Sequence, residues 1–313
     1  MDMTFKEVAL MYLEQPTKSG KHQAKTLRVQ EFVAEMIDRW GDLPIKNFQQ
    51  KALGAVFISE LRKRPCKNRA GVLSNGSVNQ RIVYLRAVLH YACKEEFIER
   101  VPTYSCYPEG KRELFLTPKQ ARELIRWLDP LRADMAEFCL NTGFRVSNIC
   151  NLRWDQLSDD FKTVYVKAKK TKNGEATSFP MNRDAQRILR RYKEKRDDLI
   201  RDYTWIKNRG VEHVFIQDEV RNEKLLGTPL RQTSVTNLTW KNAVKNANLP
   251  KETVFHSLRH TFASWHIMSG TGETTLMQLG GWKNATSMQR YMHLNHEHKA
   301  KAASAMEGML RSR

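Results

Sequence analysis

Apolar side chains recur every three or four positions through most of the first hundred residues, which is the spacing of amphipathic helices. Ser77 has the short polar side chain that favours a helix N-cap. Polar, glycine and proline residues separate the apolar stretches, most clearly at 65–76. The pattern predicts helices over residues 3–15, 24–40, 49–64 and 77–97. The first part of the chain is therefore expected to be all-helical.

The helical pattern breaks between Pro102 and Arg112, where two prolines and a glycine interrupt it. Segments of this composition are typical of links between domains. A chain of 313 residues is long enough to bury two separate cores. We therefore expect a first domain at residues 1–103, a linker at 104–115 and a second domain at 116–313.

Helical spacing also dominates the second domain, but two short segments alternate between apolar and polar side chains. These segments, Val164–Lys167 and Thr177–Pro180, flank a turn and predict a β-hairpin, with His213–Gln217 as a third short strand. A helix is expected to start at Thr117 and Pro118. Further helices are expected at about 131–141, 146–152, 182–195, 232–247, 256–268, 273–280, 284–292 and 297–310. The expected fold class is mainly α with a small β-hairpin or sheet, as an α+β domain after an all-α domain.

A large excess of positive charge accompanies these patterns. Lys and Arg number 53 against 34 Asp and Glu, which gives a formal net charge of +19. Such a chain attracts polyanions over long range, and its binding to them weakens steeply as salt rises. Charge alone does not choose between nucleic acid, the ribosome and a membrane surface.

Other features exclude several classes of protein. No apolar run approaches the length of a membrane span and residues 1–7 lack a signal-peptide pattern, so we expect a cytoplasmic protein with no membrane partner. The five cysteines form no C-x-x-C pair, which argues against a disulfide framework and against a zinc finger. No glycine-rich nucleotide loop is found, so no cofactor is expected.

Positive charge is concentrated just before the predicted fourth helix, where five cations fall within eight positions. A solvated helical surface gives the same pattern for any single residue. As a cluster beside the start of a helix, these cations favour contacts with DNA phosphates. The candidate DNA-binding residues are Arg62, Lys63, Arg64, Lys67 and Arg69, with Asn79, Arg81 and Arg86 on the helix itself.

The second domain contains a candidate phosphate site in the sequence H-S-L-R-H, which begins at His256. His256 and Arg259 are three residues apart, so a helix presents both on one face. Arg offers a planar fork of donors that fits phosphate oxygens, and the hydroxyl of Tyr291 is a candidate nucleophile beside it. A zinc helix through His256 and His260 is the alternative, but it requires Glu where Ser257 stands. No metal is therefore expected.

Three further residues extend this set. Arg145 follows Gly143 in T-G-F-R-V, Lys172 lies in the T-K-N-G turn of the predicted hairpin, and Trp282 ends the sequence L-G-G-W. From about Leu116 to the end, the chain resembles the tyrosine recombinases, the phage integrase family. The resemblance rests on six residues in this order: Arg145, Lys172, His256, Arg259, Trp282 and Tyr291.

The resemblance implies that the protein cleaves and rejoins DNA through a 3′-phosphotyrosine on Tyr291. Arg145 and Arg259 would hold the two non-bridging oxygens of the phosphate. His256 would accept the tyrosine proton or donate to the phosphate. Lys172, on its turn, would protonate the departing 5′ oxygen.

Two positions depart from the pattern of the family. Trp282 stands where many members have His, and it would either donate its indole N–H to the phosphate or pack as an apolar wall. Asn148 stands where many members have an acidic residue, which bears on how Arg145 is oriented. His260 is expected to be structural rather than catalytic.

The resemblance also implies partners. These are double-stranded DNA with a specific recombination site, a homo-tetramer on two duplexes, and an accessory DNA-bending or directionality factor. The first domain would correspond to the core-binding domain of these enzymes. We therefore expect a site-specific recombinase or integrase, most simply of a phage or mobile element. A DNA-relaxing enzyme like the type IB topoisomerases and a catalytically inactive, sequence-specific DNA-binding protein remain as alternatives.

Overall fold

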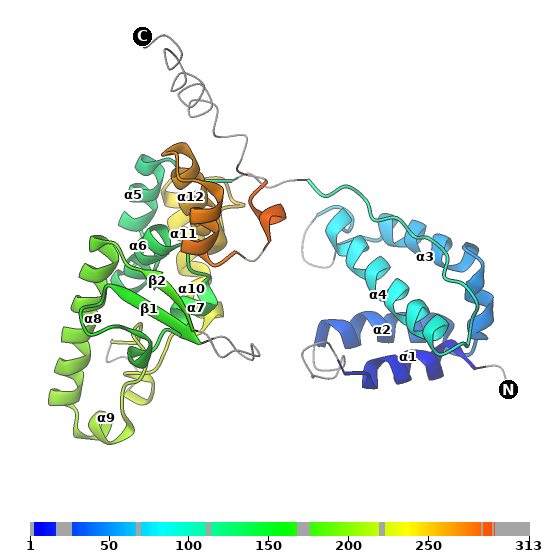
Figure 1. Ribbon diagram of the computed structural model, residues 1–313, viewed down its shortest axis with the longest axis horizontal. Coiled ribbons are helices and arrows are strands. Elements are labelled where there is room, and N and C mark those ends of the chain that lie inside the picture. The colour runs from blue at the N-terminus through cyan, green and yellow to red at the C-terminus, as the bar shows by residue number, and fades with distance from the viewer. Residues whose placement is uncertain are drawn as a thin grey trace, which may run out of the picture. The chain divides into compact units, whose positions relative to one another are not determined.

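The computed structural model describes residues 3–16, 27–66, 70–110, 114–167, 176–218, 223–282, 284–289 and 291. The chain divides into two compact units, Met1–Lys111 and Arg112–Arg313 (Figure 1). Each unit has a hydrophobic core of its own. The described residues are mainly helical with one small sheet, which confirms the expected fold class.

The described part of the first unit contains only helices and connecting segments. An aromatic cluster at its centre joins the first three α-helices, since the ring of Trp40 lies 5.4 Å from that of Phe5 and 4.9 Å from that of Phe57. These helices lie close to the predicted ranges because their apolar positions face one core. The elements are α1 (Phe5–Glu14), α2 (Leu27–Trp40), η2 (Ile45–Gln49), α3 (Ala52–Lys63) and α4 (Asn75–Lys94).

The fourth helix begins earlier than the sequence predicts. Ser74, and not Ser77, is its N-cap, because the Ser74 hydroxyl accepts a hydrogen bond from the backbone N–H of Ser77 at 3.3 Å. Both residues are serines before an apolar run, so the sequence pattern fits either position. The helix ends at Lys94, three residues before the predicted end.

Part of the predicted linker packs onto the first unit. Tyr104 is 2% exposed, and a Cβ at Gly54 would lie 2.4 Å from its ring, so the helix α3 needs glycine there. Further on, the amide of Asn79 donates to the backbone oxygen of Tyr107 and accepts from its N–H, both at 2.8 Å. The compact unit therefore extends to residue 111, past the predicted domain end at 103.

The second unit is built around two helices that supply much of its core. Helix α12 packs against α6 and α13, and α6 also packs against α8 (Figure 1). Its described helices are α5 (Pro118–Arg126), α6 (Pro130–Thr142), α7 (Val146–Cys150), α8 (Arg183–Asp202), α9 (Thr204–Arg209), α10 (Gln232–Val235), α11 (Leu238–Asn246), α12 (Phe255–Met268) and α13 (Glu273–Gly280). Short 3-10 turns are η3 (Trp154–Gln156), η4 (Glu223–Leu225) and η5 (Ala285–Ser287). Among the described residues, none of these helices is both long and apolar enough to cross a bilayer.

The predicted hairpin is present as an antiparallel pair. Strands β1 (Thr163–Lys167) and β2 (Ala176–Pro180) are in register with Val164 opposite Phe179, and both of these side chains are buried in the core. Alternation along each strand therefore turns one face toward the second unit's core, as the pattern predicts.

Two other predicted elements differ in the structure. Residues 213–217 are not a strand, because only isolated bridges hold them, between Arg153 and His213 and between Ile216 and Pro229. The helix predicted at 284–292 is instead the short turn η5, where Met288 N–H donates to the Ala285 oxygen three residues back. The helix predicted at 297–310 lies outside the described residues.

Candidate active site

Helix α12 carries the centre of the candidate site. Its apolar residues, including Leu258 and Phe262, are buried, and the hydroxyl of Ser257 accepts the backbone N–H of Val254 at the start of the helix. Burial of the apolar face fixes the rotation of the helix, and the same rotation carries Arg259 inward to 2% exposure. The motif H-S-L-R-H is therefore partly core and partly functional site.

Gly143 receives the side chain of Arg259. It ends α6 in the left-handed region, with φ of 66°, and its carbonyl oxygen accepts a hydrogen bond from Arg259 Nη1. A Cβ at this position would lie 2.5 Å from the ring of Phe262. Glycine is thus required both by the backbone conformation and by the close approach of α12.

The guanidinium of Arg259 has unused capacity to bind an anion. Its Nη2 is buried and has no hydrogen-bond partner among the described residues. Burial, together with the charge of Arg145, lowers its pKa to about 10, so the group still carries its proton at neutral pH. A buried cation with an unpaired donor is costly unless a ligand completes its hydrogen bonds. The geometry therefore favours an anion at this position.

Arg145 supplies a second cation to the same place. It is the N-cap residue of α7, two positions after Gly143, and its side chain is exposed. Its charge is near enough to disfavour the protonated form of Arg259. Two neighbouring guanidinium groups repel each other when the site is empty, and a phosphate between them would relieve that repulsion.

Trp282 forms a wall beside Arg259. The guanidinium carbon lies 3.8 Å from the centre of the Trp282 ring, and the same ring stacks with that of Phe262 at 6.4 Å between centroids. A Cβ at Gly280 would lie 1.7 Å from the same ring, so the turn after α13 has room for Trp282 only because residue 280 is glycine. This packing and the cation–π contact orient Arg259.

Tyr291 lies against α12 in a small apolar cluster with Met288 and Leu276, and it is 5% exposed. Its hydroxyl is hydrogen-bonded to Nδ1 of His260. His260, which the sequence favours as structural, thus contacts the candidate nucleophile directly. The sequence does not predict the contact between His260 and Tyr291, and its only indication is that His260 directly follows Arg259.

His256 stands one helical turn before His260. Its side chain is exposed, and its ring meets that of His260 edge to face, with 4.8 Å between centroids. Five of the six predicted catalytic residues lie in the described chain, and α12 and the segments that contact it carry them all. The sixth, Lys172, lies outside the described residues.

The predicted DNA-binding residues of the first unit differ in their surroundings. Asn79 is 6% exposed and holds the backbone of Tyr107, so it is a structural residue and not part of an exposed polar face. Arg64 and Arg81 both pair with the carboxylate of Glu35. Internal partners of this kind were not visible in the sequence because they lie 29 to 46 positions away.

The remaining predicted DNA-binding residues that the structure describes are more exposed to solvent than Asn79, Arg64 and Arg81. Lys63 and Arg86 are exposed, and Arg62 is exposed while its guanidinium stacks on the ring of Tyr107 at 4.6 Å. Lys67 and Arg69 lie outside the described residues.

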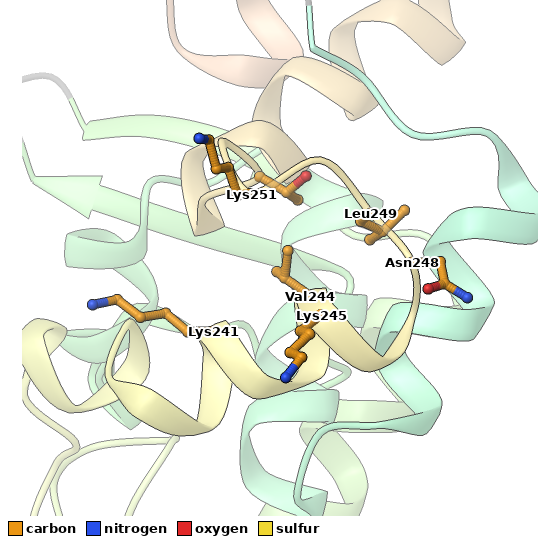
Figure 2. Close-up of a pocket in the computed structure, with 7 residues that line it drawn as sticks. Lys241, Val244, Lys245, Asn248, Leu249 and Lys251 are labelled. Atoms are coloured by element: carbon orange, nitrogen blue, oxygen red, sulfur yellow. The ribbon is translucent and has the colours of Figure 1, made fainter. Parts of the chain in front are cut away.

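A separate cavity of about 510 Å³ lies between α11 and the start of α12. None of the predicted catalytic residues lines it (Figure 2). The side chains of Lys241 and Lys245 extend in different directions in Figure 2. Its lining residues are Lys241, Val244, Lys245, Asn248, Leu249, Lys251 and Thr253.

Known proteins with similar sequences share this second unit. The model of the phage integrase family matches residues 114–298. The integrase of Salmonella phage P22 is 27% identical over 230 residues, which are 72% of this chain and 56% of that protein. The tyrosine recombinase XerA of Thermococcus kodakarensis is 25% identical over 251 residues, 79% of this chain and 78% of that protein.

Solved structures share the fold. The Tn1549 transposon integrase, residues 82–397 in complex with circular intermediate DNA, superposes with a TM-score of 0.70 at 20% identity and covers 96% of this chain and 99% of that one. A lambda integrase tetramer bound to a Holliday junction gives 0.66 at 17% identity, covering 94% and 79%. With the family model matching more than half of its residues, the chain belongs to the phage integrase family, whose members are tyrosine recombinases.

Proposed function

We propose that this protein is a site-specific DNA recombinase that cleaves and rejoins DNA through a 3′-phosphotyrosine on Tyr291. One observation carries the proposal. The buried guanidinium of Arg259, with an unpaired Nη2, lies in the same cluster as the Tyr291 hydroxyl. A phosphodiester placed there meets both a fixed positive charge and a nucleophile.

Each residue of the site has a defined task in this proposal. Arg259 and Arg145 bind the non-bridging oxygens and stabilise the charge that grows on them as the pentacoordinate phosphorus forms. Trp282 holds the guanidinium of Arg259 in place through the cation–π contact. Exposed His256 donates to the phosphate, and Lys172 gives a proton to the departing 5′ oxygen.

The chemistry conserves the energy of the broken ester. The Tyr291 oxygen bonds to phosphorus while the bond to the 5′ oxygen breaks, so a free 5′ hydroxyl is released. That hydroxyl, or one from a second duplex, reverses the step and frees the tyrosine. No nucleotide cofactor is needed, because the phosphotyrosine is itself a phosphodiester.

The first unit is proposed to hold the DNA beside this site. Exposed cations on α3 and α4, such as Lys63 and Arg86, are available for phosphate contacts. We assign DNA binding to the first unit, Met1–Lys111, and catalysis to the second unit, Arg112–Arg313. Asn79 supports the fold of the first unit in this assignment.

The proposed partners are a specific double-stranded site and three further copies of the chain, forming a tetramer on two duplexes. The structures of the Tn1549 integrase with DNA and of the lambda integrase tetramer on a Holliday junction support this by similarity of fold. We propose a phage or mobile element as the source and an accessory DNA-bending or directionality factor as a further partner. The five scattered cysteines, which form no C-x-x-C pair, fit the reducing cytoplasm as the place of action.

A strand-transfer assay tests the proposal. DNA that flanks the coding sequence would be searched for an inverted repeat, and duplexes with that repeat would be incubated with the protein. We expect a covalent adduct on the peptide that contains Tyr291, and joining of labelled strands to a second duplex. Relaxation of any supercoiled plasmid without strand exchange would support a topoisomerase instead, and specific binding without an adduct would support an inactive DNA-binding protein.

A further inference from the structure

The hydroxyl of the proposed nucleophile, Tyr291, is in direct contact with a histidine. His260 Nδ1 and the Tyr291 oxygen form a hydrogen bond, and the two rings lie 5.8 Å apart between centroids at 45°. The other histidine of the motif, His256, is one turn earlier on α12 and exposed. The two rings meet edge to face, with 4.8 Å between centroids.

The surroundings of this pair restrict what the hydrogen bond can do. Tyr291 is 5% exposed and packs in a cluster with Met288 and Phe262, which limits the access of water to its hydroxyl. A phenol is a poor nucleophile until its proton leaves, and bulk water is not positioned to take it. The imidazole nitrogen of His260 is an acceptor within hydrogen-bond reach of the hydroxyl.

Helix geometry explains how the adjacent residues Arg259 and His260 contact different parts of the site. Arg259 and His260 are consecutive on α12, so their side chains leave the helix about 100° apart. Arg259 turns toward Gly143 and Trp282, where it faces the phosphate position. His260 turns toward Tyr291. The same helix therefore positions Arg259, which would bind the phosphate, and His260, which contacts the nucleophile Tyr291.

We propose that His260 is the catalytic base that accepts the Tyr291 proton during DNA cleavage. This inference rests on the proposed function. The neutral His260 ring, with its proton on Nε2, accepts the phenolic O–H at Nδ1. As the tyrosine oxygen bonds to phosphorus and the bond to the 5′ oxygen breaks, the phenolic proton moves to Nδ1. In the rejoining step the resulting imidazolium returns that proton to the departing tyrosine oxygen, so protons balance over the cycle.

The direct test compares two variants of His260 with two of a matched control. His260→Ala removes the ring, and His260→Asn keeps a hydrogen-bonding group without a basic nitrogen. His266→Ala and His266→Asn change a half-buried histidine on the same helix, whose Nδ1 contacts Thr271 Oγ1 at 2.9 Å and does not touch Tyr291. Adduct formation would be measured in a single turnover on a nicked duplex, after thermal melts and DNA binding show folded protein.

We expect both His260 variants to form the adduct about 100-fold more slowly or worse, because a positioned general base contributes roughly 10²–10⁴-fold. The His266 variants should stay within about threefold of the parent. Rates within threefold for His260→Ala would overturn the proposal. Recovery of the parent rate in His260→Asn would also overturn it, because that result would mean that His260 only orients the hydroxyl.

A second measurement separates proton removal from support of the fold. Tyr291 would be replaced by 3,5-difluorotyrosine through amber suppression, which makes the phenol more acidic and a base less necessary. The penalty of His260→Ala, or of His260→Asn if the first fails to fold, should then shrink at least tenfold. An undiminished penalty would overturn the proposal. If Tyr291→Phe itself still forms an adduct, the proposed function fails, whereas a dispensable His260 with an essential Tyr291 removes only this inference.

Discussion

Arg259 and Trp282 show how much of the site depends on single contacts. Arg259 is held at one end by the oxygen of Gly143 and across its face by the indole, which leaves Nη2 for a ligand. A flexible arginine would lose rotamer entropy on binding phosphate, and these contacts remove much of that cost before DNA arrives. The site is therefore organised before its substrate is bound.

The packing of Trp282 leads to a prediction that separates its two expected roles. Trp282→Phe keeps an aromatic face for Arg259 and Phe262, so we expect cleavage to slow by no more than about tenfold, since a desolvated cation–π contact is worth about 2 kcal/mol in full. Trp282→His loses most of that face and should be at least about tenfold slower than Trp282→Phe. Single-turnover cleavage by protein shown to be folded is the measurement. A His variant faster than the Phe variant would mean that the indole N–H acts on the phosphate.

Among the secondary-structure elements, α6 and α12 approach closely at Gly143, so an added side chain there should lower stability. Gly143→Ala should destabilise the second unit by about 2–4 kcal/mol, because it adds left-handed strain to a clash with Phe262. Gly71→Ala is the control for backbone strain without a clash, since Gly71 has φ of 92° but open space around it. It should cost only about 1–2 kcal/mol. Denaturant unfolding would measure both, and equal losses would show that the contact with Phe262 does not matter.

In the first unit, the buried residue Asn79 and the exposed residue Arg86 should respond differently to substitution. Asn79→Ala should lower its stability by about 1–3 kcal/mol, because the N–H and oxygen of Tyr107 lose their partner. Arg86→Ala should change stability by less than about 0.5 kcal/mol and weaken DNA binding. Thermal melts and binding titrations of both variants test this. The assignment fails if Arg86→Ala is the variant that unfolds.

The sequence predicted helices and strands correctly where the spacing of apolar residues within the segment determines the structure. Helices α1, α2, α12 and α13 and the hairpin followed from apolar spacing alone. Residues 213–217 looked like a strand because Val214, Phe215 and Ile216 are all apolar, but each is buried against loops that supply only isolated bridges. Whether an apolar run finds a partner strand is decided by tertiary structure, which periodicity does not contain.

The candidate site was predictable to a similar degree. Motif order pointed to six residues. Five of them lie in the described chain, on α12 or on segments near it, and their catalytic roles stay predictions; these five are Arg145, His256, Arg259, Trp282 and Tyr291. The bond between His260 and Tyr291 was not predictable, since it joins residues 31 positions apart through the fold of the segment after α13. Asn79 was misassigned for the same reason, because its partner Tyr107 lies 28 positions away.

For the whole molecule, the charge of +19 makes salt the simplest variable to change. If the two units together neutralise six to ten phosphates, affinity for a duplex should fall by about 10³–10⁵ between 50 and 200 mM salt. Titrations at four or five salt concentrations give the slope. Affinity that is nearly independent of salt would contradict phosphate binding by the basic surface.

Tyr291 is the proposed nucleophile, and the proposed cleavage reaction cannot occur without its hydroxyl. Tyr291→Phe removes this oxygen and leaves the ring in its cluster with Met288. On a nicked duplex that traps the cleaved state, the parent protein should accumulate a covalent adduct. The variant should bind the same duplex within about twofold and form none. An adduct that persists in Tyr291→Phe would contradict the account, because neither Arg290 nor Met292 carries a hydroxyl that could replace it.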